Sequence, residues 1–174
     1  MIVTNLKDNL RITPYINVKN RAKELNCNMP DGIAILPLNF EDANSKRDLF
    51  YDDNIDTTRK ILRSAGIQLS SIEKEDEIYP HLVKHSIEWI GPTILFTATI
   101  VFQNPHLISL TLNVVANYLT ELFKANPLDK KNAHLSLVIE LPSGQSKKIN
   151  YDGPPDGLRE LPDIIRSLNN EEKS

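Results

Sequence analysis

Residues 89–102, WIGPTILFTATIVF, form the most apolar stretch of the 174-residue chain, and their pattern decides the fold class. From residue 93 to residue 102, β-branched and aromatic side chains alternate with a period of two, which is typical of a strand. The apolar length is well below the roughly 20 residues that a membrane-spanning helix requires. A lone strand in lipid would also leave its amides without partners. We therefore predict an interior β-strand over 93–102 and no integral membrane association.

The segments on both sides of this strand have helical periodicity. Residues 80–90 predict an amphipathic helix whose polar and apolar side chains lie on opposite sides. Residues 105–124 predict the longest helix of the chain, with a broad apolar stripe. Leu110 and Leu112 lie outside or at the margin of that stripe, so we expect this helix to contact a second surface in addition to its own sheet.

The N-terminal half predicts a strand, a helix and a second strand. An apolar run over 33–40 follows a Pro-Asp-Gly turn, and its Pro37 cannot donate to a sheet, which places this residue at an edge or a strand end. Asp56 is a suitable N-cap for the helix that follows it, and Gly66 suits the left-handed position after the helix end. A strand over 67–72 completes a unit of the βαβ type, which is right-handed if its strands are parallel neighbours.

The C-terminal third predicts a hairpin and a final helix. Alternating apolar residues over 134–141 and 147–151 flank a Pro-Ser-Gly-Gln turn, which indicates an antiparallel β-hairpin. Pro162 is expected to divide the amphipathic segment over 158–168 into a turn and a short helix. The order of elements predicts an α/β or α+β fold: a mixed β-sheet with helices packed against it, and a C-terminal β-hairpin followed by a short helix.

The length of the chain suits one hydrophobic core, so we predict a single α/β domain over 33–168. Residues 1–32 are polar and contain Thr13-Pro14. This pattern predicts either an irregular N-terminal arm or a short helix that Thr13 caps, and it leaves both interpretations open. Residues 169–174, NNEEKS, are expected to form a frayed tail.

Charge and cysteine content exclude several classes of function. The chain carries 20 basic and 23 acidic residues, so it has no excess positive charge to neutralise a phosphate backbone, and we expect no nucleic-acid partner. Cys27 is the only cysteine, which excludes an intrachain disulfide and a zinc cage built on cysteines. The first residues lack a basic region followed by an apolar core, so we expect a cytoplasmic protein rather than a secreted one.

One group of side chains has the spacing of metal ligands. On the predicted helix over 80–90, spacings of four and three residues place His81, His85 and Glu88 on one face, within reach of a shared divalent metal. This face would serve a small metal-dependent hydrolase if it lined a cleft. The competing interpretation is that it is only the polar side of an amphipathic helix, since no fourth ligand is identifiable.

A polar, acidic loop is expected over 41–55, and its Asp52 and Asp53 are the acids that such a hydrolase would use. A calcium loop beginning at Asp52 requires Gly at its sixth position and Glu at its twelfth, where the sequence has Thr57 and Arg63, so that motif fails. The chain also lacks a glycine-rich phosphate loop and a Gly-x-Ser-x-Gly elbow, which lowers the prospect of an enzyme.

The sequence favours a non-catalytic interaction or accessory module without a cofactor. We expect it to act by docking on a protein partner or as a homo-oligomer, with Leu110 and Leu112 as the candidate interaction surface. The metal-dependent hydrolase is the alternative. Peripheral membrane attachment through the helix over 105–124 ranks last, because the polar positions of that helix carry no basic residue to meet anionic lipid.

Overall fold

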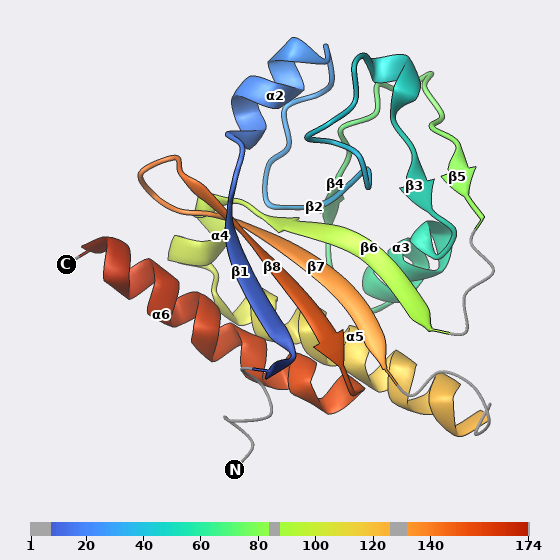
Figure 1. Ribbon diagram of the computed structural model, residues 1–174, viewed down its shortest axis with the longest axis vertical. Coiled ribbons are helices and arrows are strands. Elements are labelled where there is room, and N and C mark those ends of the chain that lie inside the picture. Colours follow the sequence, from blue (N-terminus) through green and yellow to red (C-terminus); the bar gives the residue numbers. More distant parts are fainter. Residues whose placement is uncertain (1–7, 84–87, 126–131, 174) are drawn as a thin grey trace.

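A six-stranded mixed sheet organises the protein, described here from a computed structural model at residues 8–83, 88–125 and 132–173 (Figure 1). The strand order is β1-β8-β7-β6-β2-β4. These strands are β1 (Leu10–Tyr15), β2 (Ile33–Leu36), β4 (Leu69–Ser70), β6 (Trp89–Phe96), β7 (Ala133–Glu140) and β8 (Ser146–Gly153). The β2/β4 and β6/β7 pairs are parallel and the other neighbours are antiparallel. Two further short strands, β3 (Tyr51–Asp52) and β5 (His81–Leu82), pair in parallel beside this sheet.

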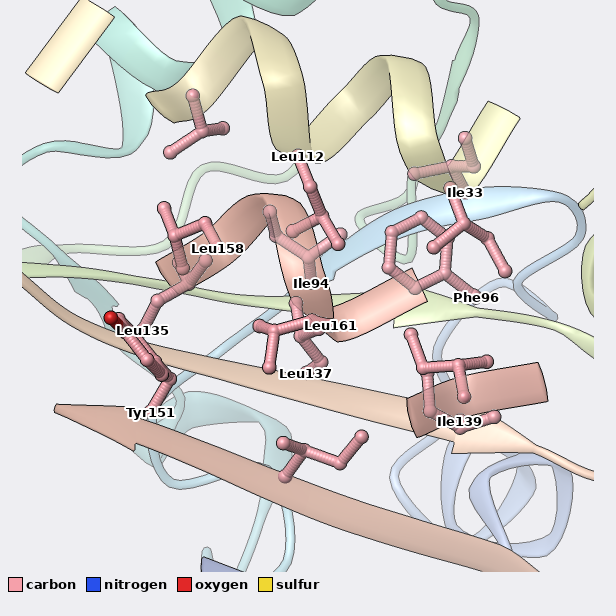
Figure 2. Packing of buried hydrophobic residues seen from close by; sticks show 14 of the residues in the cluster. Ile33, Ile94, Phe96, Leu112, Leu135, Leu137, Ile139, Tyr151, Leu158 and Leu161 are labelled. Carbon is pink, nitrogen blue, oxygen red and sulfur yellow. The ribbon is translucent and has the colours of Figure 1, made fainter. Parts of the chain in front are cut away.

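Helices cover both faces of the sheet. They are α2 (Val18–Glu24), η1 (Lys46–Asp48), α3 (Ile55–Ser64), α4 (Ala98–Gln103), α5 (His106–Ala125), η2 (Pro155–Glu160) and α6 (Leu161–Lys173). The longer helices α5 and α6 lie on one face and enclose the larger hydrophobic cluster, part of which Figure 2 shows. A second cluster lies on the other face, between the sheet, α2 and the loop after β2. The mixed sheet with packed helices confirms the predicted fold class.

The predicted hairpin and βαβ unit are both present. In the hairpin, β7 and β8 pair antiparallel with Leu137 opposite Ile149. In the βαβ unit, β2 and β4 pair in parallel on either side of α3 in the sequence. Gly66 has a φ of +83°, as predicted for the residue after the helix end. The prediction for the start of α3 is wrong by two residues: the N-cap is Asn54, and Asp56 lies in the first turn.

The predicted strand over 93–102 is correct in its first half and wrong in its second. Strand β6 is an interior strand, but it ends at Phe96 and the chain then enters α4. Thr97 anchors this corner because its backbone N–H and hydroxyl both donate to the carbonyl of Gly32. The next amide, of Ala98, donates to the buried carboxylate of Glu140 at 3.0 Å, and a carboxylate is favourable at a helix N-terminus.

The predicted helix over 80–90 is wrong wherever the structure describes the chain. Residues 81–82 form β5, and β6 begins at Trp89. The backbone amide of Tyr51 donates to the carbonyl of Pro80, which holds this segment against β3. Trp89 is buried, and a Cβ atom at Gly91 would lie 2.2 Å from its ring, so the close packing of this strand requires glycine at residue 91. The apparent helical period therefore spans two separate strands.

The N-terminal segment contains a short helix, as one of the two interpretations predicted, but Thr13 does not cap it. Residues 10–15 form the edge strand β1, and α2 begins later, where the side chain of Asn17 accepts from the amide of Asn20 at 2.9 Å. The amide of Asp152 donates to the carbonyl of Asn9, so the alternation of an antiparallel pair turns the missing N–H of Pro14 away from β8. Proline is tolerated in this position because the open edge needs no donor there.

The C-terminal segment divides into a turn and a helix, as predicted: the 3-10 helix η2 ends at Glu160 and α6 begins at Leu161. Pro162 lies in the first turn of α6, where a missing N–H breaks no hydrogen bond. Helix α6 continues to Lys173 through the segment expected to fray from residue 169. Two features hold the end of this helix in place. The side chain of Asn169 is buried, and the carboxylate of Glu172 accepts from the amide of Ser143 at 3.0 Å.

Candidate functional site

The three predicted metal ligands do not share a helix face in the described residues. His81 lies on β5, with its Nδ1 3.9 Å from a carboxylate oxygen of Asp56 in α3. Glu88 lies just before β6 and contacts His134 instead. His85 lies outside the described residues. Among the residues that are described, no group of three or more His, Cys, Asp or Glu side chains could hold a metal ion. The metal hypothesis assumed a helix over 80–90, and the described residues of this range form strands instead.

The contact of Glu88 belongs to an ion-pair cluster that spans three strands. The ring nitrogen Nε2 of His134 faces the carboxylate of Glu88, and Nδ1 lies 3.2 Å from a carboxylate oxygen of Asp152. A protonated imidazole donates from both nitrogens, which suits a ring held between two carboxylates. Both ring nitrogens of His134 are therefore engaged by carboxylates in this structure. His134 lies opposite Asp152 in the hairpin, so extending the predicted hairpin by one residue pair would have found this contact.

This cluster borders a hollow of about 360 Å³ that residues of β1, β7 and β8 line. Arg11 of β1 lies at one side of it, and Ser136 of β7 donates its hydroxyl proton to Asn150 of β8 at 2.7 Å. The charged side chains are substantially exposed: His134 retains 30% of its surface and Asp152 retains 57%. Exposed ion pairs contribute from zero to about 1 kcal/mol. The cluster is best explained as a set of surface ion pairs that link neighbouring strands of the sheet.

The two predicted catalytic acids, Asp52 and Asp53, differ in their exposure to solvent. Asp53 is exposed, whereas Asp52 is only 3% exposed. One carboxylate oxygen of Asp52 accepts from the amide of Asn54 at 2.9 Å, and its other oxygen has no partner in the described part of the chain. Burial raises the pKa of Asp52 to about 6, against the lowering effect of its backbone hydrogen bonds.

A partly buried ion pair between Arg59 of α3 and Glu73 holds the loop after β4 against α3 and β3. The guanidinium of Arg59 lies 2.5 Å from the carboxylate of Glu73 and 4.8 Å from the centre of the Tyr51 ring. The hydroxyl of Tyr51 donates to the same carboxylate. Burial, together with the hydrogen bond to Glu73, raises the pKa of Tyr51 far above its ordinary range. These groups stabilise the loop, and their mutual contacts leave no exposed nucleophile or base among them.

A different surface combines exposed apolar side chains with a hollow. The hollow has a volume of about 510 Å³ and lies where β2, β4 and α5 begin, beside α4. Its apolar lining consists of Ile33, Ile67, Leu69, Ile100 and Leu107. Asp31, Gln68 and Ser70 lie at the same hollow and supply polar groups.

The two helices beside the hollow also carry exposed apolar residues. Leu110, three residues after Leu107 on α5, is 40% exposed, and Phe102, two residues after Ile100 on α4, is 58% exposed. We name the exposed Phe102 and Leu110, together with the hollow, the α4–α5 surface. The sequence prediction missed Phe102 because a strand would have placed it on the same face as the buried Ile100, whereas a helix turns the two apart.

The second residue of the predicted interaction surface is in the core. Leu112 is fully buried, and Figure 2 shows it pointing from α5 toward Ile94 of the sheet. The stripe of α5 is wider than predicted, because buried residues on this helix include Ala116 as well as Leu112. Leu112 is therefore excluded as a surface contact, and Leu110 remains.

Comparison of the chain with family models, with curated proteins and with solved structures finds no match. No helix within the described residues is long and apolar enough to cross a membrane.

Proposed function

We propose that the protein is a non-catalytic accessory module that docks on another protein chain through the α4–α5 surface. One observation carries this proposal: the exposed Phe102 and Leu110 stand on the two helices that border an apolar hollow of about 510 Å³. Single exposed apolar residues are ordinary on a soluble protein, whereas their combination with an apolar hollow is typical of a binding surface. Aromatic residues are also enriched among the side chains that dominate binding energy.

The contacts of His134 and the burial of Asp52 favour docking over catalysis. His134 has both ring nitrogens engaged by carboxylates. Asp52, a residue of β3, is buried rather than presented to solvent. Neither residue has the free, accessible group that general acid–base chemistry requires.

The apolar content of this surface is sufficient for a specific contact. Transfer of a large apolar side chain from water into an interface contributes about 1.5–3 kcal/mol. Phe102 is 58% exposed and Leu110 is 40% exposed, so covering both contributes about as much as the complete burial of one such side chain. The apolar lining of the hollow adds to this free energy. Together these side chains can supply the dominant contact of an interface.

Photo-crosslinking in the native cell tests the proposal. A benzophenone amino acid replaces Leu110 in one strain and Leu82 in another; Leu82 is the matched control, because it is also a leucine, is 39% exposed and lies on β5 far from α4 (Figure 1). We expect a discrete crosslinked species from position 110 and none from position 82. The proposal is wrong if position 110 yields no discrete species, or if position 82 yields the same species at equal intensity.

A further inference from the structure

We propose that the small β3/β5 sheet is a pH-dependent switch, in which ionisation of Asp52 raises the fraction of molecules whose β5 strand has separated from β3. This inference goes beyond the proposed docking function and does not depend on it.

The β3/β5 sheet is small, and its outer strand is exposed. Each strand contributes two residues. Tyr51 and Asp52 of β3 are buried, whereas His81 and Leu82 of β5 are exposed. A two-stranded pair of this kind is at best marginally stable by itself in water. Of the two strands, β5 is therefore the one that can separate without taking a buried residue out of the core.

The surroundings of Asp52 favour its protonated form while the sheet is closed. The side chain is only 3% exposed, and one carboxylate oxygen accepts from the amide of Asn54. The other oxygen has no hydrogen-bond partner among the described residues. A buried charge that is incompletely hydrogen-bonded is costly. Burial accordingly raises the pKa of Asp52 to about 6, from the ordinary 3.8 of a carboxyl group in water.

The charged groups around Asp52 do not reverse this effect. Within the described part of the chain, Asp53 beside it raises the pKa of Asp52, and Arg59 of α3 lowers it. The guanidinium of Arg59 is itself paired with Glu73, and the neighbouring strand β6 carries no titratable residue. Burial therefore remains the dominant influence on Asp52.

A second titratable contact of the same sheet acts in the same direction. The ring nitrogen Nδ1 of His81 on β5 lies 3.9 Å from a carboxylate oxygen of Asp56 on α3, and the two groups attract as ions only when the imidazole is protonated. Because both side chains are partly exposed, this pair contributes little. Acid pH thus favours the attachment of β5 through both contacts, and Asp52 supplies the larger share.

The direction and size of the switch follow from the ionisation of Asp52 in the closed and the open sheet. Below about pH 4 the carboxyl group is protonated in both states. Between about pH 4 and pH 6 it ionises in the open state, where water reaches it, but not in the closed state, so closure weakens. The difference of about two pKa units corresponds to about a hundredfold rise in the equilibrium constant for opening. Tyr79, which is buried and stacks on Tyr51, keeps the separated strand anchored to the core.

Amide hydrogen exchange of the full chain, followed by NMR from pH 4 to pH 7, tests the inference. The reporter is the amide of Tyr51, which donates to the carbonyl of Pro80 and loses this bond when β5 separates. The reference is the amide of Leu141, which donates to the carbonyl of Gln145 in the hairpin. After correction for the intrinsic exchange rate, we expect the protection of the Tyr51 amide to fall by up to about a hundredfold over this range. At pH 7 it should be lower than the protection of the Leu141 amide, as local opening requires.

Matched variants assign the effect to Asp52. In Asp52→Asn the Tyr51 amide is expected to be equally protected at pH 4 and pH 7, whereas Asp53→Asn, which alters the exposed neighbour, should behave like the unaltered protein. The inference is overturned if protection in Asp52→Asn falls as much as in the unaltered protein. It is also overturned if His81→Gln abolishes the fall, because the switch would then reside in His81.

The unaltered protein provides a test that requires no variant. If the amides of Tyr51 and Leu141 show equal protection at every pH, β5 separates only when the whole chain unfolds, and the inference is wrong. None of these results bears on the crosslink from position 110, so the inference and the proposed function can fail independently.

Discussion

Replacement of Asp52 by asparagine should change how stability depends on pH. Burial raises the pKa of Asp52 from its ordinary value of 3.8 to about 6, so the folded protein holds this proton more tightly than the unfolded chain does. The stabilising contribution of the protonated side chain is present below about pH 4 and is lost as pH rises to about 6. The difference of about two pKa units corresponds to about 3 kcal/mol of stability.

Asparagine has nearly the same shape and cannot ionise, and its oxygen can still accept from the amide of Asn54. We therefore expect Asp52→Asn to equal the unaltered protein near pH 4 and to exceed it by up to about 3 kcal/mol above pH 7. Urea unfolding across this pH range measures the difference. Asp53→Asn is the control, because this exposed neighbour should change stability little at any pH. A pH-independent difference, or a less stable Asp52→Asn protein at pH 7, would refute the reasoning.

Three further substitutions test the fold and the site by urea unfolding. Glu140→Ala removes the acceptor of a helix N-terminal amide and should cost about 1–3 kcal/mol. Glu75→Ala, in the exposed loop after β4, should cost little, and equal costs would contradict the capping role. Leu112→Ala should cost about 2–5 kcal/mol and Leu110→Ala less than about 1 kcal/mol, and the reverse order would contradict their placement in core and surface. His134→Gln should cost less than about 2 kcal/mol, because both of its ion pairs are exposed. A larger loss would show that these ion pairs stabilise the fold more than exposed pairs normally do.

The parts of the fold that could be predicted are those that local patterns specify. The hairpin depends on alternation and on a turn with Gly144, whose φ is +93°. Helix α3 is indicated by its own apolar period and by Gly66, and α5 by its length and stripe. Each of these signals lies within about twenty residues of sequence, so no knowledge of distant contacts is needed.

The errors arise where a distant residue determines local structure. The alternation over 93–102 continues past Phe96, but Glu140 and Gly32, far away in sequence, form the corner that turns the chain into α4. Similarly, the local pattern of Thr13-Pro14 indicates a helix start, whereas β8, the strand partner of this segment, lies more than a hundred residues further along the chain. Tertiary contacts override local propensity at both positions.

The candidate site shows the same limit. Leu110 could be identified from the helical stripe, but Leu112 could not be separated from it until the packing of α5 on the sheet was known. Phe102 became a surface residue only because the corner at Thr97 changes its direction. His134 gained its significance from Glu88, a residue whose pairing no local pattern indicates.

The most direct test of the account is the yield of crosslinks from position 110 in cells when the same chain also carries Phe102→Ser. If the α4–α5 surface is the docking surface, this second change should abolish most of the crosslinked species, while Leu82→Ser in its place should leave the yield unchanged. An unchanged yield with Phe102→Ser would contradict the account, because a chain that docks through this surface should lose affinity when its exposed aromatic side chain is removed.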